Sequence, residues 1–502
     1  MVLFIIIHLL MMNYGAAEPC ISRYYGYNSF VCVCNSTYCD SVEDVTVDAG
    51  FATVVSSSLS EHRLKHTKVG FNNVNNNGTK LIVNRNIKMQ EVFGFGGSFT
   101  DSATFNIAQL SESAQERLLG SYYGPGSAEY TLGRMNIGGC DFSSRLYTYA
   151  DLEGDITLSS FALQEEDLMY KIPMIKRAQT MSNREIKLIA SAWSAPAWMK
   201  SNNALYDKGY LLPEYWQVWA DYILKFLDSY AGNGIHFWGI TPQNEPINGN
   251  IPGFTFNCMG WNATTQTNWV AHHFGPTLWN GGYSNLSVMI MDDQRFLLPG
   301  WAETVVSNPE AEQYVSGIAV HWYFDRSTPP SFLDETHNAL PDYFILSTEA
   351  CAGDNIWEDS VALGSWDRAE DYMHDIIEDL NHWVVGWIDW NLALNPEGGP
   401  NWAENFVDSP IIVNATADEF YRNPMFYAMA HVSKFVTPGS IRIETMLLDS
   451  DLECVGFERL DGSTVILILN RSEEDELLII SDGSQGNLEF AIPKRSIHTV
   501  IY

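Results

Sequence analysis

The middle of the chain alternates short apolar runs with amphipathic stretches whose hydrophobic residues recur at helical spacing. The clearest such stretch is Pro213–Ala231, with apolar residues near i, i+3, i+7 and i+10, and a second runs from Trp366 to His382. Eight runs of strand character alternate with helical segments, which predicts an α/β chain folded as a (β/α)8 barrel. The runs are Gln90–Asp101, Tyr130–Phe142, Ile186–Pro196, Ile235–Pro246, Leu286–Arg295, Ser316–Tyr323, Tyr343–Glu349 and Val384–Asn391.

The C-terminal part has a different pattern. From Ile441 to the end, short apolar runs follow one another, and Asp461-Gly462 lies between two of them as a hairpin signal. Residues Val45–Met89 show the same succession of short strands. We therefore expect an all-β domain built from both ends of the chain, with the barrel inserted between its two halves.

The first residues predict export. Leu3–Met12 is an apolar run, and Gly15-Ala16-Ala17 supplies the small residues of a cleavage site, so residues 1–17 are predicted to be a signal peptide. The run is shorter than the ~20 residues that span a bilayer. No later segment reaches that length without charges, so we expect no transmembrane segment in the mature chain.

Cysteines and glycosylation sequons agree with export. Cys20, Cys32, Cys34 and Cys39 crowd together, and four cysteines allow three pairings between which spacing does not choose. Without a CxxC pair or a His-rich cluster, we expect no zinc site and no other metal. The other cysteines are scattered and are interpreted as free thiols: Cys140, Cys258, Cys351 and Cys454. Candidate glycosylation sites are Asn35, Asn77, Asn262, Asn285, Asn414 and Asn470.

Charge excludes one class of partner. The 502 residues include 28 Lys and Arg against 61 Asp and Glu, a formal charge of −33. Such a chain is repelled by phosphate backbones, so we expect no nucleic-acid partner. The length calls for a large domain with at least one smaller one.

Two predicted strands end on glutamate. The fourth run ends at Gln243-Asn244-Glu245-Pro246, and the seventh, YFILSTEA, stops on Glu349. Barrel enzymes place catalytic groups at the carboxyl ends of their strands, and a buried carboxylate without partners is costly. Two such groups meet the needs of glycoside hydrolysis, in which one carboxylic acid protonates the leaving oxygen and the other carboxylate attacks the anomeric carbon.

Polar and aromatic residues at the other strand ends can bind a sugar. Asn244 is placed to bond the 2-hydroxyl, and Trp193 or Trp390 to lie against the ring face. Candidates for the other hydroxyls are Asp101, Asp141 and Asn405.

Weaker signals at the strand ends favour structural roles. GFGG at Gly94–Gly97 lacks the third glycine of a dinucleotide loop and is interpreted as a tight turn at a strand end. His321 is expected to be a hydrogen-bonded pocket histidine rather than a general base. Asp292-Asp293 has no third metal ligand at a recognised spacing, and Glu349 explains the site without Cys351 as a thiol nucleophile.

At these residues the chain resembles glycoside hydrolase family 30, and within it the glucosylceramidase group. The resemblance runs from about Cys20 to Tyr502. The segments that carry it are GFGGSFTD, TPQNEP, DDQRFLLPGWA, GIAVHWY, STEACAG, LGSWDR and WNLALNPEGGPNW through NFVDSPII.

The resemblance implies a retaining mechanism with Glu245 as acid/base and Glu349 as nucleophile, their carboxyl groups about 5–5.5 Å apart, and no cofactor. The positions that match the glucose pocket of the family are Asp141, Trp193, Asn244, Tyr323, Trp390 and Asn405. The positions that match residues surrounding that pocket are Arg134, Arg295 and His321. Apolar loop residues near the pocket mouth, which could receive a ceramide chain or simply pack, are Phe254, Phe256 and Trp261.

The resemblance also completes the domain organisation. It implies that a small antiparallel sheet accompanies the barrel and the β-sandwich, and that the disulfides are Cys20–Cys32 and Cys34–Cys39. The expected limits are 18–44 plus 393–421 for the small sheet, 45–89 plus 440–502 for the sandwich, and 90–392 plus 422–439 for the barrel.

The implied function is hydrolysis of glucosylceramide in anionic membranes to glucose and ceramide. The resemblance further implies delivery through the secretory pathway to the lysosome lumen, with a secreted form open, and a saposin-type activator and a sorting receptor as partners. Two alternatives stay open: another β-glycosidase of the family, acting on xylosides, fucosides or β-1,6-glucan, and an inactive sugar-binding protein.

Overall fold

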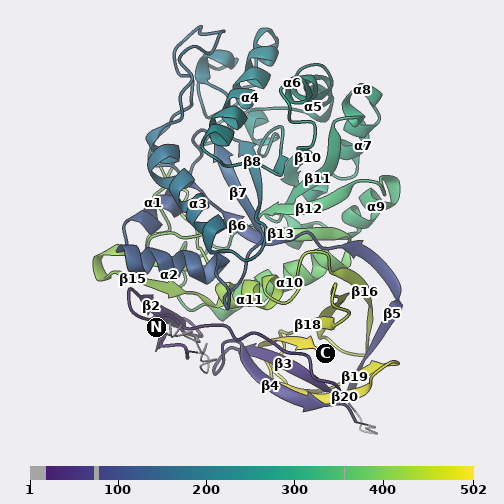
Figure 1. Cartoon of the computed structure of the whole chain (residues 1–502). Helices are drawn as coiled ribbons and strands as arrows, with labels where there is room; N and C mark the ends of the chain where they lie inside the picture. Colours follow the sequence, from purple (N-terminus) through teal and green to yellow (C-terminus); the bar gives the residue numbers. More distant parts are fainter. Residues whose placement is uncertain (1–17, 73–77, 356) are drawn as a thin grey trace, which may run out of the picture.

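The computed structural model describes residues 18–72, 78–355 and 357–502. In Figure 1 the barrel and its helices form one body, with a β-sheet body below it and a small sheet at its side. The predicted signal peptide, residues 1–17, and the sequon at Asn77 lie outside the described residues. Among the described helices, none is both long and apolar enough to cross a bilayer.

Eight parallel strands close into a barrel, as the sequence predicts. Each of the eight predicted runs overlaps one of these strands. Strand β11 begins one residue before its run, β13 has the bounds of its run, and the other six strands are shorter than their runs. The strands are β6 (Gly94–Ser98), β7 (Leu132–Ile137), β8 (Lys187–Ala192), β9 (Gly239–Ile240), β10 (Ser287–Gln294), β11 (Val315–His321), β12 (Phe344–Glu349) and β13 (Val384–Asn391).

Helices connect successive barrel strands and cover the barrel from outside (Figure 1). Both predicted amphipathic helices are confirmed as α4 and α10, although Pro213–Tyr215 forms a separate 3-10 turn before α4. On α4 the buried face includes Trp219, Ile223 and Phe226. The helices are α1 (Asp101–Ala108), α2 (Glu112–Tyr123), α3 (Ile172–Met181), α4 (Trp216–Gly232), α5 (Ala263–Trp269), α6 (Gly275–Asn280), α7 (Gly300–Val306), α8 (Pro309–Glu312), α9 (Ser331–Ala339), α10 (Trp366–Asn381) and α11 (Pro424–Ser433).

The accessory domain is a nine-stranded sheet that takes strands from both ends of the chain. Strand β5 pairs with β16, and β21 pairs with β3, so N- and C-terminal segments share one hydrogen-bonded array. Its two halves enclose a separate core that includes Leu81, Ile466 and Ile480. The strands are β3 (Phe51–Ser58), β4 (Lys65–Gly70), β5 (Thr79–Glu91), β16 (Ile441–Leu448), β17 (Glu453–Glu458), β18 (Thr464–Asn470), β19 (Glu476–Asp482), β20 (Gly486–Ile492) and β21 (Ser496–Ile501).

The small antiparallel sheet joins the Cys-rich N-terminus to a segment far along the chain. Its strands, in spatial order, are β1 (Ser22–Arg23), β2 (Val31–Asn35), β15 (Glu419–Arg422) and β14 (Ile411–Asn414).

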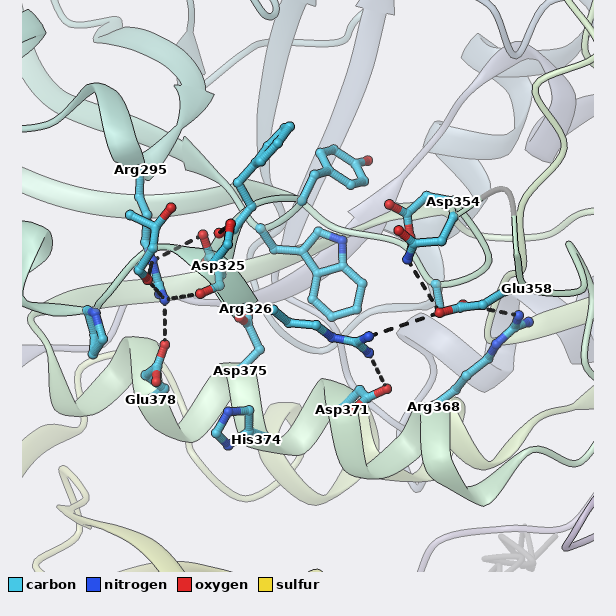
Figure 2. Close-up of a pocket in the computed structure, with 18 of the residues that line it drawn as sticks. Arg295, Asp325, Arg326, Asp354, Glu358, Arg368, Asp371, His374, Asp375 and Glu378 are labelled. Atoms are coloured by element: carbon cyan, nitrogen blue, oxygen red, sulfur yellow. Dashed lines mark hydrogen bonds and ion pairs between the residues drawn. The ribbon is translucent and has the colours of Figure 1, made fainter.

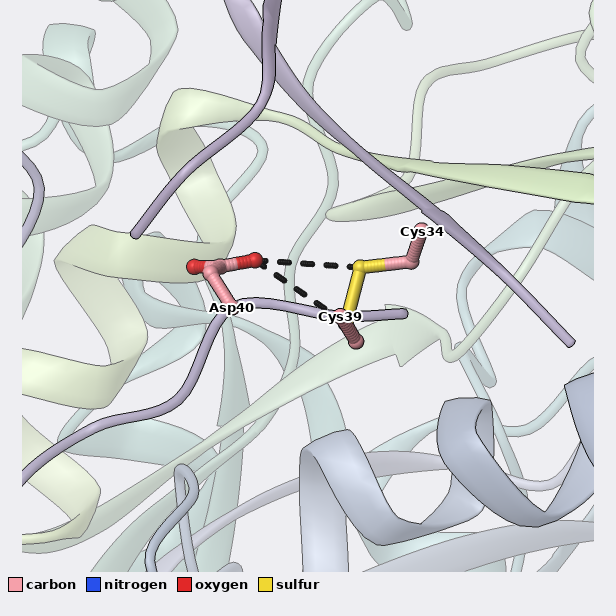
Figure 3. Close-up of side chains that lie close together, drawn as sticks. All are labelled: Cys34, Cys39 and Asp40. Atoms are coloured by element: carbon pink, nitrogen blue, oxygen red, sulfur yellow. Dashed lines mark hydrogen bonds between the residues drawn. A yellow bond between two sulfur atoms is a disulfide. The ribbon is translucent and has the colours of Figure 1, made fainter. Parts of the chain in front are cut away.

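The disulfides Cys20–Cys32 and Cys34–Cys39 confirm the predicted pairing, and the other four cysteines are free. Figure 3 shows Asp40 beside the second disulfide, with Oδ1 3.7 Å from the Cys34 sulfur. The disulfide removes both sulfurs as thiolate ligands, so this trio is no metal site. Asp40 instead accepts a hydrogen bond of 2.6 Å from Tyr427 and pairs with Arg422, which fastens the small sheet to α11.

Helices α10 and α11 lie between the barrel and the sandwich (Figure 1). On α11, His431 contacts Thr499 Oγ1 of β21 at 2.8 Å and Ser57 Oγ of β3 at 2.9 Å. Burial lowers the pKa of His431 well below its usual value, so the ring is neutral in these bonds. The two domains therefore share a buried polar contact that does not depend on charge. The residue limits of the domains stay a prediction.

One candidate glycosylation site is wrong. Asn470 is only 1% exposed, and its Nδ2, the atom that would carry a glycan, donates to the carbonyls of Glu474 and Pro493 at 3.0 Å each. A glycan at Asn470 would break the end of β18. The sequons at Asn35, Asn262, Asn285 and Asn414 are exposed or half-buried and stay predictions.

The GFGG segment is a strand rather than a turn. Gly94–Ser98 forms β6, buried between β13 and β7. A Cβ placed on Gly96 would lie 1.9 Å from the carbonyl oxygen of Leu132 on β7. The glycine is therefore needed because a neighbouring backbone passes at the position of a side chain.

We predict that Gly96→Ala lowers the free energy of unfolding by about 3 kcal/mol or more, because the clash is with backbone that cannot step aside. The matched control is Gly120→Ala in α2, where a Cβ would meet nothing within 4 Å. The control should be neutral or up to about 1 kcal/mol more stable. Urea unfolding of both variants measures the difference, and equal stabilities would contradict the close approach of β7.

Candidate active site

Glu245 and Glu349 come together at the carboxyl end of the barrel. Glu245 follows β9 and Glu349 is the last residue of β12. One oxygen of each carboxylate and one ring nitrogen of His321 lie within 4.8 Å of one another. Both glutamates are nearly buried, with 8% and 5% of their surfaces exposed. The spacing fits a retaining glycosidase, whose carboxyl groups lie about 5–5.5 Å apart, and is too short for an inverting one at about 6.5–9.5 Å.

Glu349 is held from two sides. Arg134 Nη1 on β7 donates to Oε2, and the Tyr323 hydroxyl donates to Oε1 at 2.7 Å. Burial raises the pKa of Glu349, while the positive charges of Arg134 and His321 and the bond from Tyr323 oppose that rise. The side chain is thus fixed in orientation, and its anionic form has three stabilising partners.

Glu245 is held by three donors of its own. Asn248 Nδ2 bonds Oε2 at 2.5 Å, while Gln294 Nε2 at 2.9 Å and His321 Nδ1 at 3.2 Å contact Oε1. Its backbone has φ +42°, a region that glutamate rarely adopts, and its N–H donates to the Asp292 carbonyl at 2.9 Å. The surrounding contacts keep this strained backbone in place, as is common at functional sites.

Asp292, at the end of β10, is the centre of the network behind these glutamates. It accepts from Arg134 Nη2 at 2.9 Å, and its Oδ1 lies 3.0 Å from His321 Nε2. Hydroxyls of three neighbouring strand ends also donate to it, at 2.6–2.7 Å: Ser191, Thr241 and Thr348. Burial alone would raise the pKa of Asp292, but Arg134 and His321 hold it well below its usual range.

His321 is a cation in this network. Burial would lower the pKa of His321, yet Glu349, Asp292 and Glu245 together raise it to about 10. Both ring nitrogens then carry protons and point at carboxylates, so the ring has no lone pair for a metal ion although Glu245, His321 and Glu349 are ligand types. The expectation that His321 is a hydrogen-bonded pocket residue agrees with these contacts.

Most of the predicted sugar-binding residues surround the same pocket. Trp193 and Trp390 stack on each other with ring centroids 5.1 Å apart, and the Arg134 guanidinium lies 5.0 Å and 5.4 Å from the two rings. Asn244 accepts from Arg134 Nη2 at 2.7 Å. The structure thus brings Trp193, Trp390, Asn244 and Tyr323 around Arg134 and Glu349.

Asp141 and Asn405 form a second polar corner of the pocket. Asn405 and Asn401 both donate to Asp141 Oδ2, at 3.0 and 3.1 Å. Burial raises the pKa of Asp141 to about 7, although the bond from Asn405 works against that shift and Glu349 adds to it. Asp141 is therefore a carboxyl group that titrates near neutrality.

Two expectations need correction, and a third is narrowed. Asp101 is not a free sugar ligand, because Lys171 Nζ at 2.8 Å, Tyr147 at 2.8 Å and Ser143 at 2.5 Å occupy it. Trp261, in the loop before α5, is buried and packs against Trp216 and Trp269, so of its two expected roles the structure favours packing over contact with a ceramide chain.

Arg295 does not surround the catalytic pair. Its guanidinium instead donates to the carbonyl of Thr328 and the carboxylate of Glu378. Its neighbour Gln294 is the residue that reaches Glu245. The direction of a side chain just past a strand end cannot be deduced from the pattern that placed Arg295 there.

Sequence reasoning missed four polar residues of the site: Asp292, Gln294, Asn248 and Asn401. The first two stand at the end of the fifth predicted run, so the strand-end rule that selected Glu245 also points to them. Of the two apolar loop residues, Phe256 packs beside the Trp193–Trp390 cluster and contacts Phe254 edge to face, with centroids 4.5 Å apart. Cys351 is buried and its pKa is raised well above the usual value, which does not suit a thiolate nucleophile.

Comparison with known proteins places this site in a family. The glycosyl hydrolase family 30 TIM-barrel domain matches residues 92–436, and the family 30 beta sandwich domain matches residues 439–500. The lysosomal acid glucosylceramidase of Mus musculus is 47% identical over 497 residues, covering 97% of this chain and 96% of the mouse protein. An endo-1,6-beta-D-glucanase of Aspergillus fumigatus is 27% identical over 435 residues, covering 82% of this chain and 84% of that protein.

Solved structures agree with the sequence relatives. The crystal structure of SrfJ from Salmonella typhimurium superposes with a TM-score of 0.83 at 29% identity, covering 90% of this chain and 99% of that one. A barrel, a sandwich and a nearly full-length relative all lead to one assignment: the chain belongs to glycosyl hydrolase family 30.

Proposed function

We propose that the protein is a retaining β-glucosidase that hydrolyses glucosylceramide to glucose and ceramide. One observation carries the proposal: two buried carboxylates lie within 4.8 Å of each other in a chain 47% identical to a lysosomal acid glucosylceramidase. Close carboxylates allow one to attack the anomeric carbon directly, with no room for a water between them.

The reaction proceeds in two displacements. The ionised Glu349 attacks the anomeric carbon, and the protonated Glu245 delivers its proton to the ceramide oxygen, which leaves as ceramide. A glucosyl–enzyme ester forms. Glu245 then removes a proton from water, the water attacks the anomeric carbon, and the ester bond to Glu349 breaks, which releases glucose and restores both groups.

The contacts of the pocket assign roles to the other residues. Arg134 and Tyr323 orient the nucleophile, since both donate to Glu349. Arg134 also occupies the carbonyl oxygen of Asn244, so the Asn244 NH2 group is the part that donates to the sugar 2-hydroxyl.

The second polar corner and the indole pair complete the sugar site. Both amides beside Asp141 donate to its Oδ2, which leaves Oδ1 to accept from a sugar hydroxyl. Because Trp193 and Trp390 stack on each other, each offers only its outer face or edge to the sugar ring.

Delivery and partners belong to the same proposal. We place the protein in the secretory pathway and the lysosome lumen, bound to membrane there, with a secreted form as the alternative; the predicted signal peptide and sequons support this route. A saposin-type activator and a sorting receptor are proposed as partners by resemblance to the family.

Related activities offer a second candidate function. The Aspergillus relative and one solved structural relative are β-1,6-glucanases, the latter 25% identical with a TM-score of 0.79. A panel of glucosylceramide, aryl β-xyloside, aryl β-fucoside and β-1,6-glucan separates the candidates. Cleavage of β-1,6-glucan without cleavage of glucosylceramide would overturn the lipid assignment.

We predict that Glu349→Gln lowers kcat for an aryl β-glucoside by at least about 1000-fold, because an amide cannot form the glycosyl ester. The matched control is Glu335→Gln at an exposed position of α9, which should turn over like wild type. In wild type, a cyclitol epoxide should label the peptide that contains Glu349, as peptide mass analysis will show. Wild-type turnover by the Gln variant would refute the assignment of the nucleophile.

We also predict that the contribution of Asp141 to stability falls as pH rises from about 4 to about 7. The folded-state pKa of Asp141, about 7, exceeds the ordinary 3.8, so at this residue the folded chain holds more protons than the unfolded chain in that window. Asp141→Asn should reduce the loss of unfolding free energy between pH 5.5 and pH 7 by roughly 2 kcal/mol.

Urea unfolding at both pH values measures this effect, with Asp342→Asn on the surface as the control. If the Asp141 variant keeps the wild-type pH dependence, the raised pKa is refuted. The control variant should show the same change in unfolding free energy between the two pH values as wild type.

The charge of the chain leads to a prediction on membranes. At −33 the protein is repelled by anionic lipid, and proton uptake by some of its 61 acidic residues near pH 5 reduces that repulsion. We expect more protein to co-sediment with anionic liposomes at pH 5 than at pH 7. Neutral liposomes are the control, and binding to anionic liposomes that does not strengthen at low pH would count against this mechanism.

A further inference from the structure

A cavity of about 580 Å³ lies beside the catalytic pocket. Its walls are the loop after β11, the loop after β12 and helix α10, and Figure 2 shows the charged side chains that line it. Tyr323, which bonds Glu349, is part of the lining. The cavity therefore adjoins the proposed active site without including its catalytic carboxylates.

Three aspartates converge beside this cavity: Asp325 and Asp375 line it, and Asp379 lies next to them. One oxygen each of Asp325, Asp375 and Asp379 lies within 4.8 Å of the others. Asp375 and Asp379 come from α10, and Asp325 from the loop after β11. Asp375 Oδ2 accepts from the indole of Trp387 at 2.8 Å.

Asp379 is the unusual member of the trio. It is 1% exposed, and neither of its carboxylate oxygens has a hydrogen bond of good geometry among the described residues, although the Ser347 hydroxyl is close enough to work against the rise of its pKa. Its one positively charged neighbour among the described residues is Arg295, whose Nη1 lies 3.7 Å from Oδ1, beyond hydrogen-bonding distance. A buried carboxylate with both oxygens free of hydrogen bonds is rarely tolerated without a ligand.

Arg295 cannot balance the charge of this cluster. Its Nη2 is occupied by Glu378 at 2.7 Å and by the carbonyl of Asp325 at 2.8 Å, and its Nε lies 3.1 Å from Asp325 Oδ1. Only Nη1 is without a hydrogen bond among the described residues, and one positive charge cannot neutralise several carboxylates. With Glu378 included, four carboxylates face one guanidinium.

The other cations of the cavity are already paired. Arg326 pairs with Asp371 at 2.6 Å, Arg368 pairs with Asp408, and His374 pairs with Glu453 at 2.6 Å. Among the described residues, Arg295 is therefore the one cation left for the three aspartates.

We propose that Asp325, Asp375 and Asp379 bind a divalent cation of the calcium type. The donor set is carboxylate oxygen only, which suits a hard cation and excludes metals that prefer nitrogen or sulfur. Calcium–oxygen distances of about 2.3–2.6 Å put ligands on opposite sides of the ion up to about 5 Å apart, which matches the 4.8 Å limit of this cluster. The adjoining cavity has room for the waters that complete the coordination.

The ion would brace a loop of the active site. Asp325 lies two residues after Tyr323, and the aspartates of α10 are fixed on a helix that packs against the barrel. A cation that joins them ties the loop to the helix and so steadies the hydroxyl that bonds Glu349.

Terbium luminescence on the full chain tests the site, with Tb³⁺ as the probe. Trp387 bonds Asp375, so excitation of tryptophan should sensitise Tb³⁺ emission, and Ca²⁺ should displace it. After treatment with a chelator, added Ca²⁺ should raise Tm by about 2–5 °C at concentrations near 100-fold above Kd. Asp379→Asn should abolish both effects.

Control variants separate this site from others. Asp451→Asn, in an exposed acidic stretch of the sandwich, and Glu349→Gln, in the catalytic cluster, should keep the full Tb³⁺ signal and the Ca²⁺ shift. If Asp379→Asn does not fold, Asp325→Asn on the loop should weaken Ca²⁺ displacement at least about 10-fold. Emission that survives in a folded Asp379→Asn variant, Ca²⁺ displacement in Asp325→Asn that equals wild type, or a wild-type Tm that Ca²⁺ does not move, would overturn the proposal.

Discussion

The charge balance around Asp292 is the interaction on which the catalytic site depends. Glu245 and Glu349 are buried within 4.8 Å of each other, and two anions so placed repel strongly in a medium of low polarity. Arg134 and His321 supply the opposing charge, and Asp292 fixes both of them. The neighbouring Asp293 avoids adding to the repulsion, since burial and Glu245 raise its pKa to about 8 and it keeps its proton below that pH.

The barrel is the scaffold that makes this balance possible. Arg134 comes from β7, Asp292 from β10, His321 from β11 and Glu349 from β12, and only a closed sheet directs the ends of strands so far apart in sequence to one point. The network in turn holds backbone that would otherwise relax. Asp292 has φ +58° and Glu245 φ +42°, and the hydrogen bond between their main chains joins the two strained residues.

The sequence predicts whatever depends on periodicity or on the ends of strands. Apolar runs locate all eight barrel strands, and the strand-end rule selects Glu245 and Glu349. The sequence does not show where a side chain points. Asp292 and Asp293 are adjacent residues of the same type, yet only Asp292 hydrogen-bonds to Arg134 and His321. In the same way, the pattern of residues does not show that Arg295 bonds Glu378 rather than the catalytic pair, or that Gly96 faces the backbone of Leu132. Such contacts depend on how neighbouring strands align in the folded barrel, which the order of residues along one strand does not show.

The acidic clusters around Glu349 and Asp379 show that the balance of charge, more than the types of residue, determines what a site can do. Around Glu349 each carboxylate has a cation or a hydroxyl directed at it, so the cluster can hold its negative charge and use it chemically. Around Asp379 the same residue types face a single guanidinium, whose Nη2 bonds Glu378 and backbone carbonyls and whose Nη1 lies 3.7 Å from Asp379. The catalytic cluster is complete within the chain. The cluster of Asp325, Asp375 and Asp379 lacks such a balance, and the proposed cation supplies the missing positive charge. This lack distinguishes a ligand site from a catalytic one.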